Sequence, residues 1–329
     1  MAAVLCVVAT VVSARDKGPY SLTGNARLGF TLTSSTYDPT GHRLYASARD
    51  GVYEVDTRSS KVLGQIGRVS GAGSLAFSST HRELYLLSLH EDLLRVIDID
   101  SRKVVRSFEA PAWFNVFFDA SRDELYYFRA DTRAVRVADR RDGHTITTFN
   151  LDGHPSFVLM DPARQRILVR LADHDLIQVI DTTERAIAVS WPIAAEGQSA
   201  MAVDDTGRRV FVSSGKFLKM LDGQSGKEMG RIHVGDQVRS IVCDPVTALV
   251  SAVWSQNQIS VARIGQFGLE AVQTIDARAV IRQLLLDPET HAILATATLA
   301  EDDKMGINAN TAPASGLRTS SLLTLRYSK

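Results

Sequence analysis

Two arginines stand at matching places in the chain and are well suited to holding an anion. Arg239 and Arg282 each come five residues before an aspartate that opens a turn. A guanidinium presents its N–H donors in one plane, so two of them side by side can clamp a carboxylate or a phosphate through paired hydrogen bonds. The sequence leaves an alternative open, in which each arginine pairs with a local acid such as Asp236 or Asp276 or reaches solvent.

His154, in the stretch DGHPSF, is the candidate for acid–base chemistry, because an imidazole titrates near neutral pH. Glu196 and Asp236 complete the candidate catalytic set. The competing interpretation makes His154 a turn residue that precedes Pro155. The sequence does not decide between the two.

Motifs that would identify a reaction are missing from the chain. It contains no G-x-S-x-G, H-E-x-x-H, P-loop or dinucleotide-binding pattern. The remaining histidines fall singly at predicted turns and give no metal-ligand spacing. Trp113, Trp191 and Trp254 do not recur at one position, which disfavours a tryptophan-docked quinone. We therefore expect no metal and no cofactor, and an enzymatic role has no motif to support it.

One turn pattern recurs seven times, from YDPTGHRLY at residue 37 to LDPETHAIL at residue 286. Its second position, the anchor, falls at residues 38, 78, 119, 161, 204, 244 and 287, in steps of 40 to 43. Each period holds four short apolar runs and no useful helical periodicity, which predicts four-stranded β units. A period of this length is typical of propeller blades, and such sheets must stack in a ring to bury both faces.

A second aspartate follows five of the anchors after 18 to 20 residues: Asp56, Asp98, Asp139, Asp181 and Asp222. Each ends an apolar run, where a carboxylate can accept backbone N–H bonds two residues further on and cap a turn. The last unit offers only one strand, SSLLTLRYS, after residue 299. Residues 25–32, NARLGFTL, align with the outermost strands, so we expect them to complete that unit and close the ring.

Blades written D-P-x-x-x-x-L-Y and then V-I-D-x-x-x-x-K-V-V resemble the YVTN-type repeats of exported bacterial β-propellers. That group is similar to the WD-repeat, lactonase-like and amine-dehydrogenase heavy-subunit propellers. The resemblance covers residues 25–328 and implies an all-β, seven-bladed propeller. Ser78 replaces the anchor aspartate of the second unit, and Arg263 replaces the strand-ending aspartate of the sixth.

In propellers the loops that feed the innermost strands usually form the ligand mouth, an expectation that comes from the architecture alone. Here those loops place Arg239 and Arg282 in adjacent blades. The other candidate ligand-binding residues of these loops are Trp113, Asn115, Gln198 and Gln237, and they also carry His154, Glu196 and Asp236.

Three functions fit these expectations. The first is a scaffold that binds a protein or a small anionic ligand through its loop face, without chemistry of its own. The second is a lactonase-like hydrolase or isomerase that uses His154, Glu196 and Asp236. The third is a redox-partner subunit similar to amine-dehydrogenase heavy chains. Nucleic acid is not an expected partner, because 37 basic residues balance 37 acidic ones.

The N-terminal residues predict export. An apolar run from Ala2 to Val12 ends in a small-residue cleavage site after Ala14, so residues 1–14 are typical of a secretory signal. Eleven residues are too few for a stable membrane anchor. We expect a periplasmic or secreted protein with an extension at 15–24, a single propeller domain at 25–329 and an inserted loop at 300–318. Cys243 would be a buried, unreactive thiol.

Overall fold

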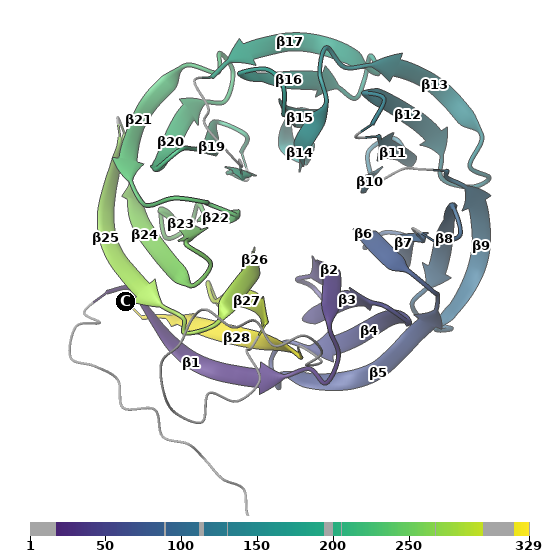
Figure 1. Ribbon diagram of the computed structural model, residues 1–329, viewed down its shortest axis with the longest axis horizontal. Helices are drawn as coiled ribbons and strands as arrows, with labels where there is room; N and C mark the ends of the chain where they lie inside the picture. Colours follow the sequence, from purple (N-terminus) through teal and green to yellow (C-terminus); the bar gives the residue numbers. More distant parts are fainter. Residues whose placement is uncertain are drawn as a thin grey trace, which may run out of the picture.

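The computed structural model confirms the all-β, seven-bladed propeller (Figure 1). It describes residues 18–88, 90–111, 115–129, 131–193, 200–204, 206–266, 268–298 and 319–328. In these ranges every regular element is a strand except one short 3-10 turn, η1 (Pro162–Arg164). No helix within them is long and apolar enough to cross a membrane. The predicted signal segment 1–14 and the inserted loop 300–318 lie outside the described residues.

Seven antiparallel sheets of four strands surround the central axis, and each is one blade. The strands of blades 1 to 3, from the axis outward, are β2 (Leu32–Asp38), β3 (Arg43–Ala48), β4 (Gly51–Asp56) and β5 (Lys61–Arg68); β6 (Ala72–Ser78), β7 (Glu83–Ser88), β8 (Leu93–Asp98) and β9 (Lys103–Glu109); and β10 (Asn115–Asp119), β11 (Glu124–Phe128), β12 (Ala134–Asp139) and β13 (Thr145–Asn150).

Blades 4 to 7 follow in the same direction around the ring. Their strands, from the axis outward, are β14 (Pro155–Asp161), β15 (Arg166–Leu171), β16 (Leu176–Asp181) and β17 (Ala186–Pro192); β18 (Met201–Val203), β19 (Arg209–Ser214), β20 (Phe217–Asp222) and β21 (Glu228–His233); β22 (Ser240–Asp244), β23 (Leu249–Trp254), β24 (Gln258–Ile264) and β25 (Leu269–Asp276); and β26 (Val280–Leu286), β27 (Ile293–Thr298), β28 (Ser320–Tyr327) and β1 (Tyr20–Arg27).

The hydrophobic core is divided among the seams between blades. Seven clusters of buried residues occur in the described ranges, and each combines side chains from two adjacent blades. The second strand of a blade, such as β7 with the sequence ELYLLS, is buried along its whole length, because both of its faces meet neighbouring blades. The outermost strands alternate instead: β9 is exposed at every second residue. Burial at the seams therefore ties each blade to its two neighbours.

The ring is closed by β1, which pairs with β28 in the last blade as expected. The position of the closing strand differs from the prediction, since the strand covers Tyr20–Arg27 rather than residues 25–32. Leu28, which the alignment assigned to the strand, instead packs into the seam between blades 7 and 1. Gly29 follows with a φ of 81°, and this left-handed conformation turns the chain inward towards β2.

The five strand-ending aspartates cap turns as the sequence predicted. Each carboxylate accepts a backbone N–H bond from a residue two or three positions later, at 2.6 to 2.8 Å. Most anchor residues do the same at the ends of the innermost strands, but the carboxylate of Asp161 in blade 4 makes no capping bond and accepts a bond from Arg166 instead. Asp38 accepts bonds from the N–H groups of Thr40 and Gly41, both at 3.0 Å. Ser78, the departure in blade 2, performs this role with its hydroxyl, which accepts a bond of 3.1 Å from His81 N–H.

Candidate functional site

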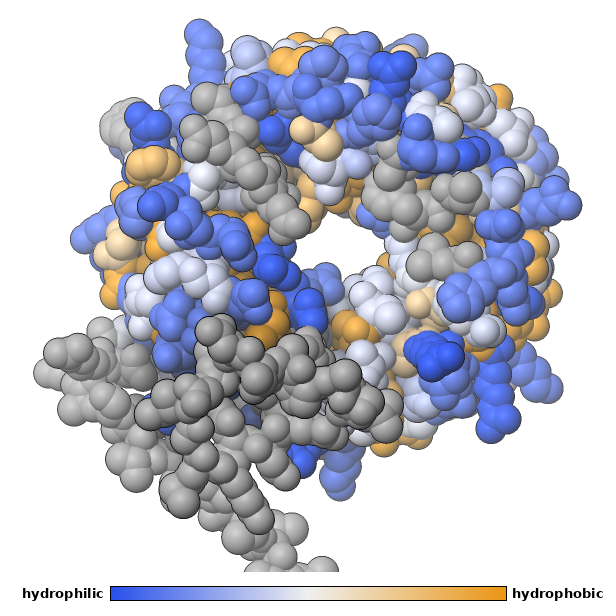
Figure 2. Space-filling model, in the orientation of Figure 1, coloured by the Kyte–Doolittle hydropathy of each residue, from blue (hydrophilic) through white to orange (hydrophobic). Residues whose placement is uncertain are grey.

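The ring has two different faces. Because the strands alternate in direction, the connectors that enter the innermost strands lie on one face, which we call the upper face. The anchor residues and their turns lie on the opposite, lower face. A channel runs between the two along the axis, and hydrophilic residues border it beside β22 and β26 (Figure 2). The upper mouth of the channel is where the sequence places the candidate ligand-binding residues.

Arg239 and Arg282 occupy the predicted positions on neighbouring blades. Arg239 directly precedes β22, and Arg282 lies in β26, where the register with β27 shifts. The two strands are tied together, because the Ser240 hydroxyl accepts a bond of 2.9 Å from Leu284 N–H. The Nε group of Arg239 is buried and has no hydrogen-bond partner in the described part of the chain. The Nε group of the exposed Arg282 donates to the Thr298 hydroxyl at 3.2 Å.

Of the alternative, pairing with a local acid is not seen among the described residues, whereas the exposed Arg282 does reach solvent. Asp236 faces Lys216, with 3.7 Å between the carboxylate and the ammonium nitrogen. Asp276 accepts bonds from the Asn257 side chain at 3.0 Å and from Arg278 N–H at 2.9 Å. Neither arginine forms an ion pair with a described acid. Among the described residues, no neighbouring carboxylate therefore compensates the charge of either guanidinium of this clamp pair, Arg239 and Arg282.

His154 has a definite partner that the sequence did not reveal. Its Nδ1 lies 2.8 Å from one carboxylate oxygen of Asp173, and its backbone N–H donates to the other oxygen at 2.9 Å. The bond from His154 lowers the pKa of Asp173 to about 2. The guanidinium of Arg170, which is buried below, donates to backbone carbonyls of the same turn and fixes its shape. His154 is thus both a turn residue and one half of an exposed histidine–aspartate pair.

Two members of the candidate catalytic set, His154 and Asp236, are described, and each is bonded to a different partner. His154 lies at the entry to blade 4 and Asp236 at the entry to blade 6, each with its own partner. Glu196 lies outside the described residues, as do Trp113 and Gln198. Asn115 lies at the start of β10 and accepts a bond of 2.6 Å from the Ser74 hydroxyl, so it joins blades 2 and 3. Gln237 is exposed in the loop before Arg239, with a φ of 58°.

The sequence search missed a recess at the lower mouth of the channel. It has a volume of about 390 Å³ and is lined by the anchor turns of blades 4 to 7. Pro162, Pro245 and Pro288 line it, and the repeated Asp-Pro pairs were a signal that could have located it. Cys243 contributes to the wall and is buried, outside any disulfide within the described residues, as expected for a packed thiol.

One group of possible metal ligands occurs in the described residues, at the turn between β12 and β13. Asp139, Asp142 and His144 offer ligand atoms within 4.8 Å of one another. The carboxylate of Asp139 is already paired with Arg141 at 2.7 Å, and this bond lowers its pKa to about 2. Because the charge of Asp139 is compensated by a guanidinium, we assign no metal to this turn.

No protein-family model and no curated protein sequence matches the chain. Similar solved structures include a chain of the mitotic checkpoint complex, with a TM-score of 0.74 and 14% identity over 100% of this chain and 99% of that one. The β-propeller domain of Cps50 (Swd1) from Myceliophteria thermophila has a TM-score of 0.70 at 14% identity, covering 92% and 99% of the two chains. A chain of Kuenenia stuttgartiensis hydrazine synthase has a TM-score of 0.69 at 14% identity, and the match covers 88% of this chain and 95% of that one. Similarity at this level of identity establishes the propeller fold, including its WD40-like variety, and no function.

Proposed function

We propose that this propeller is an exported binding scaffold that holds an acidic group of a ligand or partner protein at its upper mouth. Arg239 and Arg282 are the residues that would contact the acidic group. The chemistry is recognition of a carboxylate or a phosphate, and the scaffold carries out no reaction of its own. A role as a binding scaffold is supported by the occurrence of this fold in a protein assembly, since one chain of similar structure belongs to the mitotic checkpoint complex.

The observation that carries the proposal is the buried Nε group of Arg239, which has no partner in the described part of the chain. A buried donor without a partner costs about 1–3 kcal/mol, so a ligand that supplies an acceptor gains this energy on binding. Arg282 lies at the equivalent position of the next blade, and the nearby acids Asp236 and Asp276 are bonded elsewhere. An incoming oxyanion would therefore find two guanidiniums that no carboxylate of the described residues already occupies.

The experiment is a calorimetric titration of the protein with succinate and with inorganic phosphate as probes. We expect the double variant R239Q/R282Q to bind the better probe at least about tenfold more weakly, because each charge-assisted hydrogen bond is worth about 1.5–3 kcal/mol. The control is R263Q, since Arg263 lies on the outer strands of blade 6 and already faces Glu270 at 3.6 Å. Equal affinity in the double variant, or no binding of either probe by the parent protein, contradicts the clamp.

A second candidate function rests on the pair formed by His154 and Asp173. An aspartate that holds one nitrogen of an imidazole leaves the other nitrogen able to accept a proton, the arrangement of a general base. This favours a hydrolase or isomerase of the lactonase-like kind over a redox-partner subunit. The test is hydrolysis of a simple lactone by the parent protein and by H154Q. Activity that disappears in H154Q supports the enzyme, and an inactive parent protein rejects it.

Export itself is tested by fractionating cells that express the full chain and sequencing the mature N-terminus. The proposal expects the protein outside the cytoplasm with residue 15 at its start, since the apolar run and the small residues before Ala14 are typical of a cleaved signal. A protein that stays in the cytoplasm with residues 1–14 intact contradicts export and leaves the clamp to be judged separately.

A further inference from the structure

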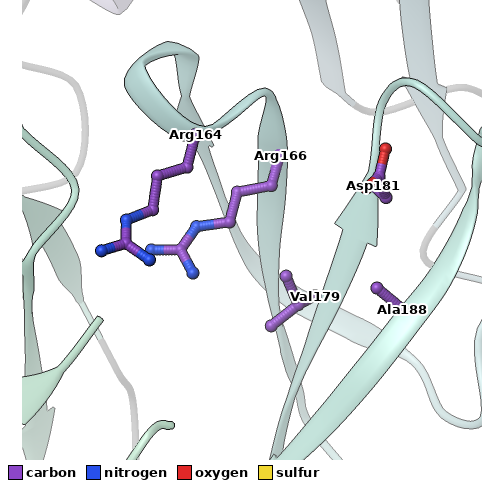
Figure 3. Close-up of a pocket in the computed structure, with 5 residues that line it drawn as sticks. All are labelled: Arg164, Arg166, Val179, Asp181 and Ala188. Carbon is purple, nitrogen blue, oxygen red and sulfur yellow. The ribbon is translucent and has the colours of Figure 1, made fainter. Parts of the chain in front are cut away.

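Two arginines from a single turn meet on the lower side of blade 4 (Figure 3). Arg164 ends the 3-10 turn η1, and Arg166 begins β15. Gln165 between them has a φ of 49° in the left-handed region, and the two guanidiniums lie next to each other (Figure 3). Two positive charges at this range repel each other, so the fold or a ligand must supply interactions that offset the repulsion. We call these two residues the turn pair.

Arg166 has a structural role that explains its position completely. It is 7% exposed, and its Nε donates to the buried carboxylate of Asp161 at 2.7 Å. Its terminal nitrogens donate across the seam to the carbonyl oxygens of Gly223 and Gly207 in blade 5. The ring of Trp191 lies 5.3 Å from its guanidinium carbon. These three bonds use three of five N–H donors, and one hydrogen on each terminal nitrogen is left over.

Arg164 has no such role. Its side chain is half-buried and forms no ion pair with a described acid. The nearby acid Asp222 is bonded instead to the backbone and the hydroxyl of Ser225, at 2.8 and 2.6 Å. Burial lowers the pKa of Arg166, and the charge of Arg164 lowers it further. Arg164 is therefore held beside a like charge without an ion pair of its own among the described residues, and only its longer-range attraction to Asp222 is seen to act against the repulsion there.

A recess opens next to the turn pair and has the size of a small-molecule site. Its volume is about 340 Å³, within the range of roughly 300–1,000 Å³ that is usual for ligand pockets. Val179 and Ala188 provide an apolar wall, and Asp181 lies at the opposite end from the arginines (Figure 3). The Asp181 carboxylate caps its own turn by accepting bonds from Thr183 and Glu184 N–H. A ligand with a second negative charge would meet this carboxylate and be repelled.

We infer that this blade-4 recess binds a small oxyanion with one charged head and a short apolar body. The head lies between the guanidinium of Arg164 and the two remaining N–H groups of Arg166. The body lies on Val179 and Ala188. Planar N–H donors match the oxygens of a carboxylate or a phosphate, and a negative head removes the repulsion between the two arginines. The site is independent of the proposed clamp, since it lies on the lower face.

The test is a calorimetric titration with butyl phosphate and with inorganic phosphate. It uses protein that carries R239Q and R282Q, so that the clamp pair does not contribute to binding. We expect butyl phosphate to bind more tightly than inorganic phosphate, because only the former covers the apolar wall. Adding R164Q should weaken butyl phosphate binding at least about tenfold through loss of a charge-assisted contact.

A second variant fills the recess without removing a charge. Ala188 is exposed on the outer strand β17, so A188F should fold normally, and its larger side chain should exclude the butyl group. The control is A186F, on the same strand but outside the recess, which should bind butyl phosphate as tightly as its parent. Thermal unfolding of each variant verifies that the fold is intact. Binding unchanged by both R164Q and A188F overturns the inference, as does a parent protein that binds neither phosphate.

Discussion

The clamp pair on the upper face and the turn pair on the lower face both consist of two arginines, yet the protein holds them differently. Arg239 and Arg282 come from two neighbouring blades and make no bond across a seam within the described part of the chain. The one side-chain bond described for the two is from Arg282 to Thr298 within its own blade. Arg166 comes from the same turn as Arg164 and donates to two carbonyl oxygens of the next blade. A charged group that bonds across a seam belongs to the framework, and one that does not is available to a ligand. This rule makes predictions about stability that differ between the two faces.

The largest effect should follow from Arg166→Met. The substitution leaves the Asp161 carboxylate, 1% exposed, without its partner, and two carbonyl groups lose their donors. Removing one member of a buried ion pair costs about 3–5 kcal/mol in the free energy of unfolding. Urea denaturation measures the change. The matched control is R164Q from the same pair, which should stay within about 0.5 kcal/mol of the parent; similar values for the two variants would break the distinction.

Asp244→Ala should cost less, at about 2–3 kcal/mol, because it removes a buried carboxylate that accepts several hydrogen bonds. The buried carboxylate of Asp244 caps its own turn and also lies 3.0 Å from His291 of blade 7. Asp181 is the matched comparison, since it caps a turn in the same way with no ion pair to another blade in the described residues. Its replacement by alanine should cost about 1 kcal/mol. Denaturation midpoints that place D181A below D244A would contradict the rule.

Acid should destabilise both faces, and the lower face more. The pKa of Asp139 on the lower face falls from 3.8 to about 2 through its bond to Arg141, and that of Asp173 on the upper face falls to about 2 through His154. A carboxylate with a lowered pKa in the folded state contributes stability above its unfolded value, and this contribution disappears as the pH falls towards the folded value. Stability should therefore decrease between pH 4 and pH 2.

The variants D139N and D173N separate the two contributions to this acid sensitivity. Each should lose less stability than the parent over the same pH interval, as measured by thermal unfolding. The difference should be larger for D139N, because the Asp139 side chain is 14% exposed and that of Asp173 is 39% exposed, where solvent screens the charge. An acid profile identical to that of the parent in D139N would show that the turn carboxylate is not what responds.

The smallest loss of stability should come from Arg239→Met. The buried Nε group of this residue has no partner among the described residues, so removing it breaks no described bond and relieves the cost of burying that donor. We expect no loss of stability in urea denaturation and a gain of at most about 1–3 kcal/mol. A clear loss of stability would show that Arg239 supports the framework after all, and would weaken the proposed clamp.

The sequence predicted the ring because the features that build it repeat. Seven anchors at even spacing defined the number of blades, and the strand-ending aspartates were recognisable because each caps the same kind of turn. The displaced position of the closing strand has a local cause: Leu28 has the apolar character of a strand residue, but its burial comes from a seam. A pattern of apolar residues does not distinguish these two kinds of burial.

The sites were predicted less completely, because they depend on contacts between distant residues. The clamp pair was visible, since Arg239 and Arg282 occupy equivalent places in consecutive repeats. The partner of His154, by contrast, is 19 residues away in another turn. Arg166 of the turn pair stands where two other repeats also carry an arginine, Arg43 and Arg209, so comparing repeats does not single it out. The packing of blade 5 against blade 4 is what shows the difference between the two arginines. Arg166 donates to a carbonyl oxygen of blade 5, whereas Arg164 forms no ion pair with an acid among the described residues.

The pairing of β1 with β28 also determines how the ring responds to tension. Tyr20 lies opposite Tyr327, so the two strands run in opposite directions from the same end of the blade. A pull on the residues that flank them loads the hydrogen bonds one after another, as in unzipping, rather than all at once as in shear. The last blade is therefore the mechanically weakest part of the circle, and single-molecule stretching from these two points should open it before any other blade.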